Sequence, residues 1–281
     1  MYGLPEKKAK RGLAWGQMLP SCQYSGCNNS RGLASMWSRM SGYQLNDDGW
    51  YCCGECLEAA LGQQLSAHFH QEPRPQPVRT TMPMGLMLLA RGAITDPQLR
   101  EALRMQQSTG ERIGACLKRL GLIGEEEIAS VVATQWGCPV FPAESVEPAC
   151  SLLLPFSLVE RYSMLPVHLV SQGRRLFVAF CERVNHSALM AVEQMLGCET
   201  EACIVLEPKF RQVLDFRKQD AAGEVTVHRP ASAQETARII CSYAQQTGAE
   251  SLRLHAVEGN IWARLMPGNS HLDLVFEQLP S

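Results

Sequence analysis

Residues 83–94 read PMGLMLLARGAI and residues 112–123 read RIGACLKRLGLI, and these two stretches decide the fold of the 281-residue chain. The second follows the first at a period of 29 residues. The matching positions are Gly85, Leu88, Gly92, Ile94 and Gln106 in the first copy and Gly114, Leu117, Gly121, Ile123 and Gln135 in the second. Two unrelated amphipathic helices would not share five residue types at one spacing, so residues 83–135 are a tandem repeat of one structural unit.

Each copy predicts a short helix, a glycine turn and a longer helix. Gly92 and Gly121 stand where a helix C-terminus needs a left-handed residue. Thr95 can cap the next helix of the first copy, with Gln98 as its capping-box partner. In the second copy the acidic run 125–127 suits a helix N-terminus. We expect two helical hairpins that pack as a pseudo-symmetric pair.

The repeat resembles the tandem cyclic-di-GMP-binding motif at the N-terminus of type II secretion and type IV pilus ATPases, in which each copy opens with Arg-Leu-Gly. The second copy here opens with RIG at residues 112–114 and departs mainly at Lys118, where the family has an aliphatic residue. The first copy has Pro83-Met84 in place of Arg-Leu. A guanidinium makes paired hydrogen bonds to guanine or phosphate, and a proline side chain cannot.

The resemblance implies a nucleotide-sensing domain in which both copies contact the ligand. The contact residues that it implies are Gly85, Leu88, Leu89, Gly92, Gln106, Arg112, Ile113, Gly114, Leu117, Gly121 and Gln135. Two interpretations stay open at this point. The copy that keeps Arg112 binds cyclic di-GMP, or the glycines and aliphatic residues only maintain the fold.

Residues 154–218 continue the resemblance as a small α/β part. The expected strands are 165–170, 175–180 and 202–206, and the expected helices are 156–162, 186–196 and 208–218. Their order is β-β-α-β-α after the opening helix. The family usually has Asp-Pro after the second strand, where this chain has Cys181-Glu182. The resembling region is 83–218, nearly half of the chain.

A C-terminal piece, 233–281, follows a polar linker at 219–232. A helix is expected over 233–247, followed by strands at 251–257, 261–266 and 272–276. The piece is similar to a degenerate start of the ATPase body in the same family. The sequence contains no G-x-x-x-x-G-K-[ST] phosphate loop, which supplies the cradle for a triphosphate. We therefore expect no ATP hydrolysis, and we expect a protein that is not an enzyme.

A cysteine-rich head occupies residues 1–70 and holds five of the twelve cysteines. Two close pairs held by turns can present four thiolates to one zinc ion, and such a closed site is structural. The predicted ligands are Cys22, Cys27, Cys53 and Cys56. Cys52 is an alternative to Cys53, and a small core of reduced thiols is an alternative to zinc.

A proline-rich linker is expected at 71–82, because alternating prolines favour extended polyproline geometry. The net charge of −2 gives no reason to expect nucleic acid or an anionic membrane as partner. No apolar run approaches the roughly 20 residues that cross a bilayer, and no secretory signal follows the basic N-terminus. A cytoplasmic protein without membrane insertion is therefore expected.

The fold class expected from these segments is α+β. It combines a zinc-knuckle head, a tandem helical-hairpin subdomain, a small β-β-α-β-α subdomain and a C-terminal α/β remnant. The expected function is that of a non-catalytic regulator or adaptor, partnered with secretion, pilus or signalling machinery and sensing cyclic di-GMP. A structural interaction module without nucleotide is the alternative. A zinc-finger DNA-binding regulator is disfavoured because the head has no basic helix.

Overall fold

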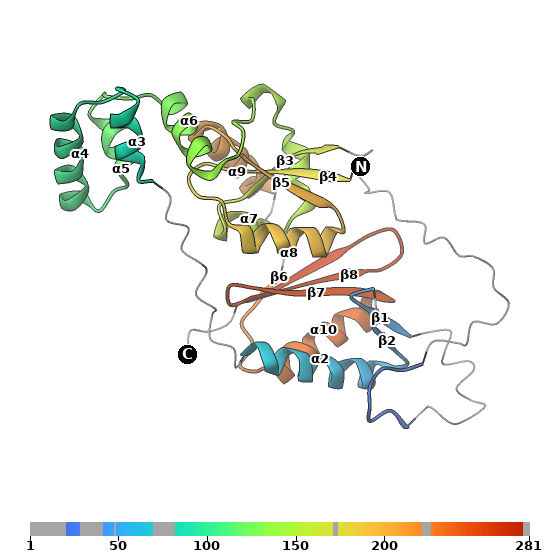
Figure 1. Ribbon diagram of the computed structural model, residues 1–281. Coiled ribbons are helices and arrows are strands. Elements are labelled where there is room, and N and C mark those ends of the chain that lie inside the picture. The colour runs from blue at the N-terminus through green and yellow to red at the C-terminus, as the bar shows by residue number, and fades with distance from the viewer. Residues whose placement is uncertain are drawn as a thin grey trace. The chain divides into compact units, whose positions relative to one another are not determined.

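The computed structural model describes residues 21–28, 42–47, 49–69, 82–170, 174–220 and 226–277. The predicted proline-rich linker lies outside these residues except for Met82. The chain forms two compact units. The terminal unit comprises residues 1–74, 190–197 and 223–281, and the central unit comprises 75–189 and 198–222. The α+β class predicted from the sequence is confirmed, and each unit has its own sheet (Figure 1).

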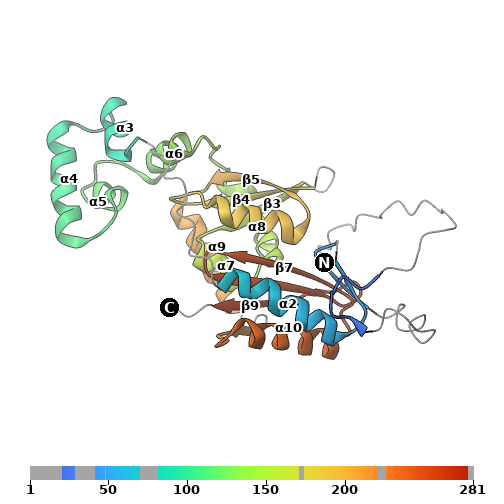
Figure 2. The ribbon, with the colours of Figure 1, turned by 60° about the horizontal axis from the view of Figure 1, so that its bottom comes forward.

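The terminal unit is built on a six-stranded sheet of order β2-β1-β7-β8-β9-β6. Its strands are β1 (Tyr43–Leu45), β2 (Gly49–Tyr51), β6 (Thr226–His228), β7 (Ser251–Val257), β8 (Asn260–Met266) and β9 (Leu272–Glu277). Two helices, α2 (Gly54–Phe69) and α10 (Ala233–Thr247), lie side by side on one face of the sheet (Figures 1 and 2). The two helices and the sheet enclose one hydrophobic core.

The cysteine-rich head and the C-terminal piece, which the sequence analysis treated as separate segments, share this fold. Strand β1 pairs with β7 in parallel, with Gln44 opposite Ser251 and Leu45 opposite Leu252. Three leucines of α2, Leu57, Leu61 and Leu65, are fully buried in the common core. The physical reason is that the buried apolar side chains of α2 complete their core only against the C-terminal sheet and α10. Strand β6 likewise falls in the stretch 219–232 that was predicted as linker.

The central unit carries the repeat as four helices. They are α3 (Met84–Ala90), α4 (Asp96–Thr109), α5 (Ile113–Arg119) and α6 (Glu125–Trp136). The predicted helical hairpins are thus confirmed, and so is the capping box, in which the backbone N–H of Thr95 donates to Gln98 Oε1 at 2.8 Å. Gly92 and Gly121 adopt φ values of 70° and 69°. Both hairpins contribute to one core, which includes Leu88, Leu99 and Leu117.

The elements that follow the repeat have the predicted order β-β-α-β-α, and they belong to the central unit except for residues 190–197, which include the end of the helix between the second and third strands. A short helix, α7 (Phe156–Arg161), precedes β3 (Leu165–Val170), β4 (Arg175–Phe180), α8 (His186–Leu196), β5 (Glu199–Ile204) and α9 (Glu207–Asp220). In this three-stranded sheet β3 is antiparallel to β4, and β4 is parallel to β5 with α8 in the crossover. Within the described ranges, no helix has the length and apolar character needed to cross a membrane.

Candidate nucleotide-binding and metal-binding sites

The two copies of the repeat begin with the same backbone conformation. Pro83 is the N-cap of α3 with φ −56° and ψ 139°, and Arg112 is the N-cap of α5 with φ −74° and ψ 151°. In each copy the carbonyl of this residue accepts a hydrogen bond from the amide four residues later, that of Met87 or that of Cys116. The copies therefore differ at this position in side-chain chemistry and not in backbone geometry.

The first glycine of each copy has a different structural role. A Cβ on Gly85 would lie 2.6 Å from Leu99 Cδ1, and Leu99 is itself buried, so packing requires glycine there. A Cβ on Gly114 would lie 3.4 Å from Met84 Sδ and 3.7 Å from Ile128 Cγ2, which are ordinary van der Waals distances. The packing of the chain therefore explains Gly85 and leaves Gly114 unexplained.

The ligand-contact residues that the motif implies fall into three groups: buried core residues, turn glycines and residues with accessible side chains. Leu88 and Leu117 are fully buried in the core of the hairpins, so they stabilise the fold. Gly92 and Gly121 serve the turns. The side chains with accessible surface are those of Leu89, Gln106, Arg112, Ile113 and Gln135. Only this last group and the backbone at Gly92 and Gly121, which are exposed, can contact a ligand without a rearrangement, because Gly85 and Gly114 are buried.

Arg112 is an exposed cation at the start of the second copy. Its side chain is 69% exposed and forms an ion pair with Glu182, in the loop after β4. The sequence analysis noted Glu182 as a departure from the family pattern but did not predict this contact. The two residues are 70 positions apart, and no local pattern links them.

Lys118, the other departure in this region, makes a second set of contacts. Its ammonium forms an ion pair with Glu125 and lies 3.6 Å from Glu207 Oε2, at the start of α9. The hydrogen bond to Glu125, with a further contribution from Glu207, raises the pKa of Lys118 above its ordinary value. Helix α5 is therefore tied to the α/β part near both of its ends, through Arg112 and through Lys118.

Crosswise contacts join the two copies. The side-chain amide of Gln135, at the end of the second copy, donates to the carbonyl of Met82, just before the first copy, at 2.9 Å. The guanidinium of Arg91 donates to Ser130 Oγ at 3.3 Å and to Thr134 Oγ1 at 2.6 Å, both on α6. Arg91, which is exposed and directly precedes the turn glycine, was not among the residues that the motif predicted.

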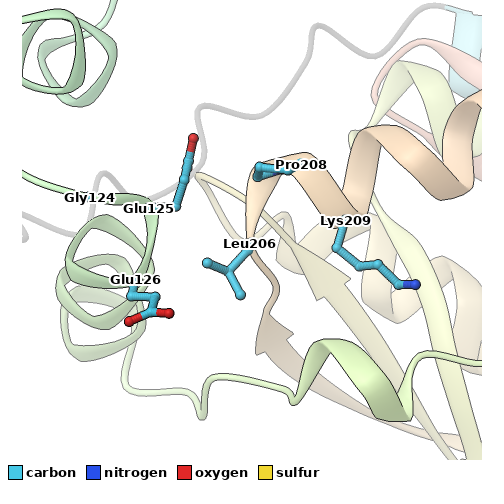
Figure 3. A pocket seen from close by; sticks show the side chains of 6 residues that line it. All are labelled: Gly124, Glu125, Glu126, Leu206, Pro208 and Lys209. Atoms are coloured by element: carbon cyan, nitrogen blue, oxygen red, sulfur yellow. The ribbon is translucent and has the colours of Figure 1, made fainter.

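A cavity of about 500 Å³ lies where the start of α6 faces the start of α9 (Figure 3). Its lining residues are Gly124, Glu125, Glu126, Leu206, Pro208 and Lys209. Two carboxylates and one ammonium line it, so it is a poor environment for a phosphate. Arg112 and Gly114 are not among its lining residues.

The cysteine cluster in the head brings together four sulfur atoms. Among the described residues, Cys22, Cys27, Cys52 and Cys56 have their Sγ atoms within 4.8 Å of one another. Cys22 and Cys27 flank a turn closed by a hydrogen bond from the amide of Cys27 to the carbonyl of Tyr24 at 3.1 Å. Cys52 follows strand β2, and Cys56 lies in the first turn of α2.

The sulfur distances fit a tetrahedral metal. Zn–S bonds of about 2.3 Å give S–S separations of roughly 3.8 Å in a tetrahedron. The Cys27–Cys52 and Cys52–Cys56 sulfur pairs lie at 3.5 and 3.8 Å. With no metal bound, burial raises the pKa of the Cys52 thiol to about 12 and also raises that of Cys56. A metal ion would displace these protons.

The fourth sulfur differs from the sequence prediction. Cys53 was the predicted ligand, and the structure puts Cys52 in the group of four instead. Cys53 Sγ lies 3.9 Å from Cys52 Sγ, next to the cluster. Cys52 and Cys53 lie in the bend between β2 and α2, and the spacing of the cysteines in the sequence does not say which of two adjacent sulfurs joins the group.

Other cysteines of the central unit lie in buried surroundings. Cys150 Sγ donates to Glu147 Oε2 at 3.4 Å, and Glu147 Oε1 lies 2.7 Å from His168 Nδ1. Burial, with Glu147 contributing, raises the pKa of Cys150 to about 12. Burial likewise raises the pKa of Cys203 to about 12. Both thiols stay protonated at neutral pH, which is unfavourable for nucleophilic catalysis.

Part of the chain is similar in sequence to known proteins. No known family profile matches it. The type IV pilus assembly ATPase PilB of Myxococcus xanthus is 29% identical over 134 residues, which are 47% of this chain and 23% of that protein. PilB of Thermus thermophilus is 28% identical over 120 residues, 42% of this chain and 14% of that protein. Bacteriophage adsorption protein B of Escherichia coli K12 is 30% identical over 130 residues, 46% of this chain and 17% of that protein.

About half of this chain can also be superposed on solved structures. The structure of MshE with cdg is 26% identical, with a TM-score of 0.41, over 48% of this chain and 98% of that one. The N-terminal domain of XpsE is 21% identical, with a TM-score of 0.36, over 52% of this chain and 97% of that one. The chain spans less than a quarter of the length of the curated relatives it matches. About 47% of this chain is therefore similar in sequence to part of type IV pilus assembly ATPases.

Proposed function

We propose that this chain is a non-catalytic regulator or adaptor of pilus- or secretion-type machinery that senses cyclic di-GMP through its second motif copy. The proposal rests on two neighbouring residues of the second copy: an exposed arginine, and a glycine whose lack of a side chain is not explained by packing. Arg112 is 69% exposed at the start of the second copy, and Gly114, two residues on, has no packing reason to lack a side chain.

The chemistry of a cyclic dinucleotide suits these two residues. The guanidinium of Arg112 can donate two parallel hydrogen bonds to a phosphate or to the acceptor edge of guanine. Gly114 is covered by the partly exposed side chain of Met84, and a base that displaces Met84 can approach the glycine backbone more closely than a side chain at 114 would allow. Leu89 and Ile113, which are partly exposed, supply apolar surface for a base.

Glu182 competes with the ligand for Arg112. An exposed ion pair of this kind is worth about 0.2–1 kcal/mol, whereas hydrogen bonds to a charged partner are worth about 1.5–3 kcal/mol. We therefore expect Arg112 to exchange Glu182 for the nucleotide, and the affinity for the nucleotide is reduced by the cost of breaking the Arg112–Glu182 ion pair. The first copy adds no arginine at Pro83, which lowers the affinity further.

The proposal assigns no catalysis to the chain. The ATPase activity in the names of the relatives belongs to proteins of which this chain spans at most 23%, and the phosphate-loop pattern is absent from its sequence. We place the protein in the cytoplasm with a protein partner in the machinery, and the proposal involves neither membrane insertion nor nucleic acid.

The proposed metal is one structural Zn²⁺ held by Cys22, Cys27, Cys52 and Cys56. The support is the donor set and its spacing, because four thiolates at tetrahedral distances are the preferred environment of zinc. Four protein ligands leave no open coordination position, so the ion has no catalytic role.

Isothermal titration calorimetry with cyclic di-GMP tests the nucleotide assignment. We expect saturable binding by the wild-type chain and a loss of about 100-fold in affinity for Arg112→Ala, since two charge-assisted hydrogen bonds are removed. The matched control is Arg119→Ala, because Arg119 is also exposed and ion-paired on the same helix, with Glu111. No heat from the wild type at high ligand concentration, or equal affinity for wild type and Arg112→Ala, would refute the assignment.

A structural interaction module without nucleotide is the second candidate function. The observation that favours it is the existing use of Arg112 as the partner of Glu182, together with proline in the first copy. If Arg112→Ala and Glu182→Gln lowered the melting temperature equally and the wild type bound no cyclic dinucleotide, this interpretation would replace the first.

A further inference from the structure

We propose that the metal ion at the four-cysteine cluster acts as a clamp that holds the N-terminal segment 21–69 on the C-terminal sheet, so that metal loading decides whether the terminal unit is complete. This inference rests on the metal assignment made above. It adds a consequence of metal binding for residues more than 170 positions away in the sequence.

The metal would join two short stretches on either side of the β1–β2 hairpin. Cys22 and Cys27 precede β1, and Cys52 and Cys56 follow β2. One further contact already links these stretches, a hydrogen bond from the amide of Gln23 to the carbonyl of Trp50 at 3.0 Å. Strands β1 and β2 have three residues each, and a hairpin of that size is marginal by itself. The metal therefore supplies the cross-link that the hairpin lacks.

The clamped hairpin is the part that extends the C-terminal sheet. The amide of Gln44 donates to the carbonyl of Glu250 at 2.7 Å, and the amide of Asn46 donates to the carbonyl of Leu252 at 2.9 Å. Asn46 Oδ1 accepts from the amide of Leu254 at 2.7 Å. Without β1, the edge of β7 would expose these main-chain groups.

Helix α2 begins at the cluster and covers the core. Its glycines allow close approach to α10, because a Cβ on Gly54 would lie 2.4 Å from Gln245 Nε2 and a Cβ on Gly62 would lie 2.5 Å from Gln234 Oε1. Cys241 Sγ on α10 lies 3.8 Å from the carbonyl of Gly54 and is buried. Release of the metal would free the start of α2, and α10 and β7 would lose their cover.

Hydrogen exchange on the full-length protein, followed by mass spectrometry, tests the clamp. Zinc is first measured per chain, then removed with a chelator and added back. We expect one zinc per chain, and at least a tenfold faster exchange of α10 and β7 after removal, reversed by zinc. Peptides from α4 and α6 in the central unit are the internal reference and should not change.

Variants separate the ligand set from its neighbour. Cys56→Ser should lose zinc and show the fast exchange of α10 and β7 without a chelator, whereas Cys53→Ser should keep both zinc and protection. If Cys56→Ser fails to fold, the chelated wild type still gives the result. Bound zinc whose removal leaves α10 and β7 protected would overturn the clamp and keep the metal site. A wild-type chain that binds no zinc would overturn the metal assignment itself.

Discussion

The two copies of the repeat have the same fold but not the same chemistry. Both have a glycine turn with φ near 70°, a buried leucine and an N-cap residue in the same extended conformation. The first copy has a proline at the cap and a glycine demanded by Leu99, whereas the second has an exposed arginine and a glycine that packing does not demand. The comparison shows that both copies keep the residues that form a helical hairpin, whereas only the second copy keeps the arginine that we propose binds the ligand.

The largest expected effect is on ligand binding when a side chain is added at the second copy's glycine. Gly114→Ala should weaken cyclic di-GMP binding by at least 100-fold, because the methyl blocks the approach of the base. Its thermal stability should hold or rise, by up to about 1 kcal/mol, since alanine favours helix over glycine. Calorimetry and thermal melting on one preparation give both values, and a stable variant with unchanged affinity would contradict the role of Gly114.

The same substitution in the first copy should act on stability. Gly85→Ala places a methyl against Leu99 in a filled core, which costs about 1–3 kcal/mol and is only partly offset by the gain in helix propensity. Denaturant unfolding should show the loss for Gly85→Ala and not for Gly114→Ala. Equal stability of the two variants would mean that the copies do not differ in the way described.

Restoring the missing arginine should make the copies more alike. Pro83→Arg fits the backbone, because Arg112 holds nearly the same φ and ψ in the equivalent place. We expect an affinity for cyclic di-GMP about tenfold higher, corresponding to one added charge-assisted contact of about 1.4 kcal/mol. Pro83→Gln, which has a long side chain without charge, is the control. If both variants bound like the wild type, the first copy would not face the ligand.

The smallest expected effect comes from freeing the arginine of the second copy. Glu182→Gln removes the charge that pairs with Arg112 and should raise the affinity two- to threefold, because exposed ion pairs are weak. The difference from wild type should shrink as salt is raised. Glu199→Gln, at an exposed carboxylate that pairs with Arg175, is the control. A reduced affinity for Glu182→Gln would show that this residue helps the ligand to bind.

Local patterns allowed the sequence to predict the hairpins, the capping box and the β-β-α-β-α order. A period of 29 and the glycines at 92 and 121 suffice for the hairpins, and Thr95 with Gln98 three residues later suffices for the capping box. The strand at 165–170 was likewise predicted with its observed bounds. These features lie in the part of the fold that local propensity and hydrophobic period determine.

What the sequence did not predict depends on contacts between distant positions. Strands β1 and β2 have three residues each, too few for a periodic signal, and the partner of β1 begins at Ser251. The Arg112–Glu182 and Lys118–Glu207 pairs join residues that only the folded central unit brings together. The choice between Cys52 and Cys53 depends on the bend between β2 and α2, which spacing leaves open.

The parallel pairing of β1 with β7 has a consequence for the time course of synthesis. Gln44 leaves the ribosome roughly 200 residues before Ser251, which at about 5–20 residues per second is on the order of 10–40 s. During that interval the leucines of α2 have no core to enter. The apolar face of α2 therefore stays without its native partners until the C-terminal sheet has been made.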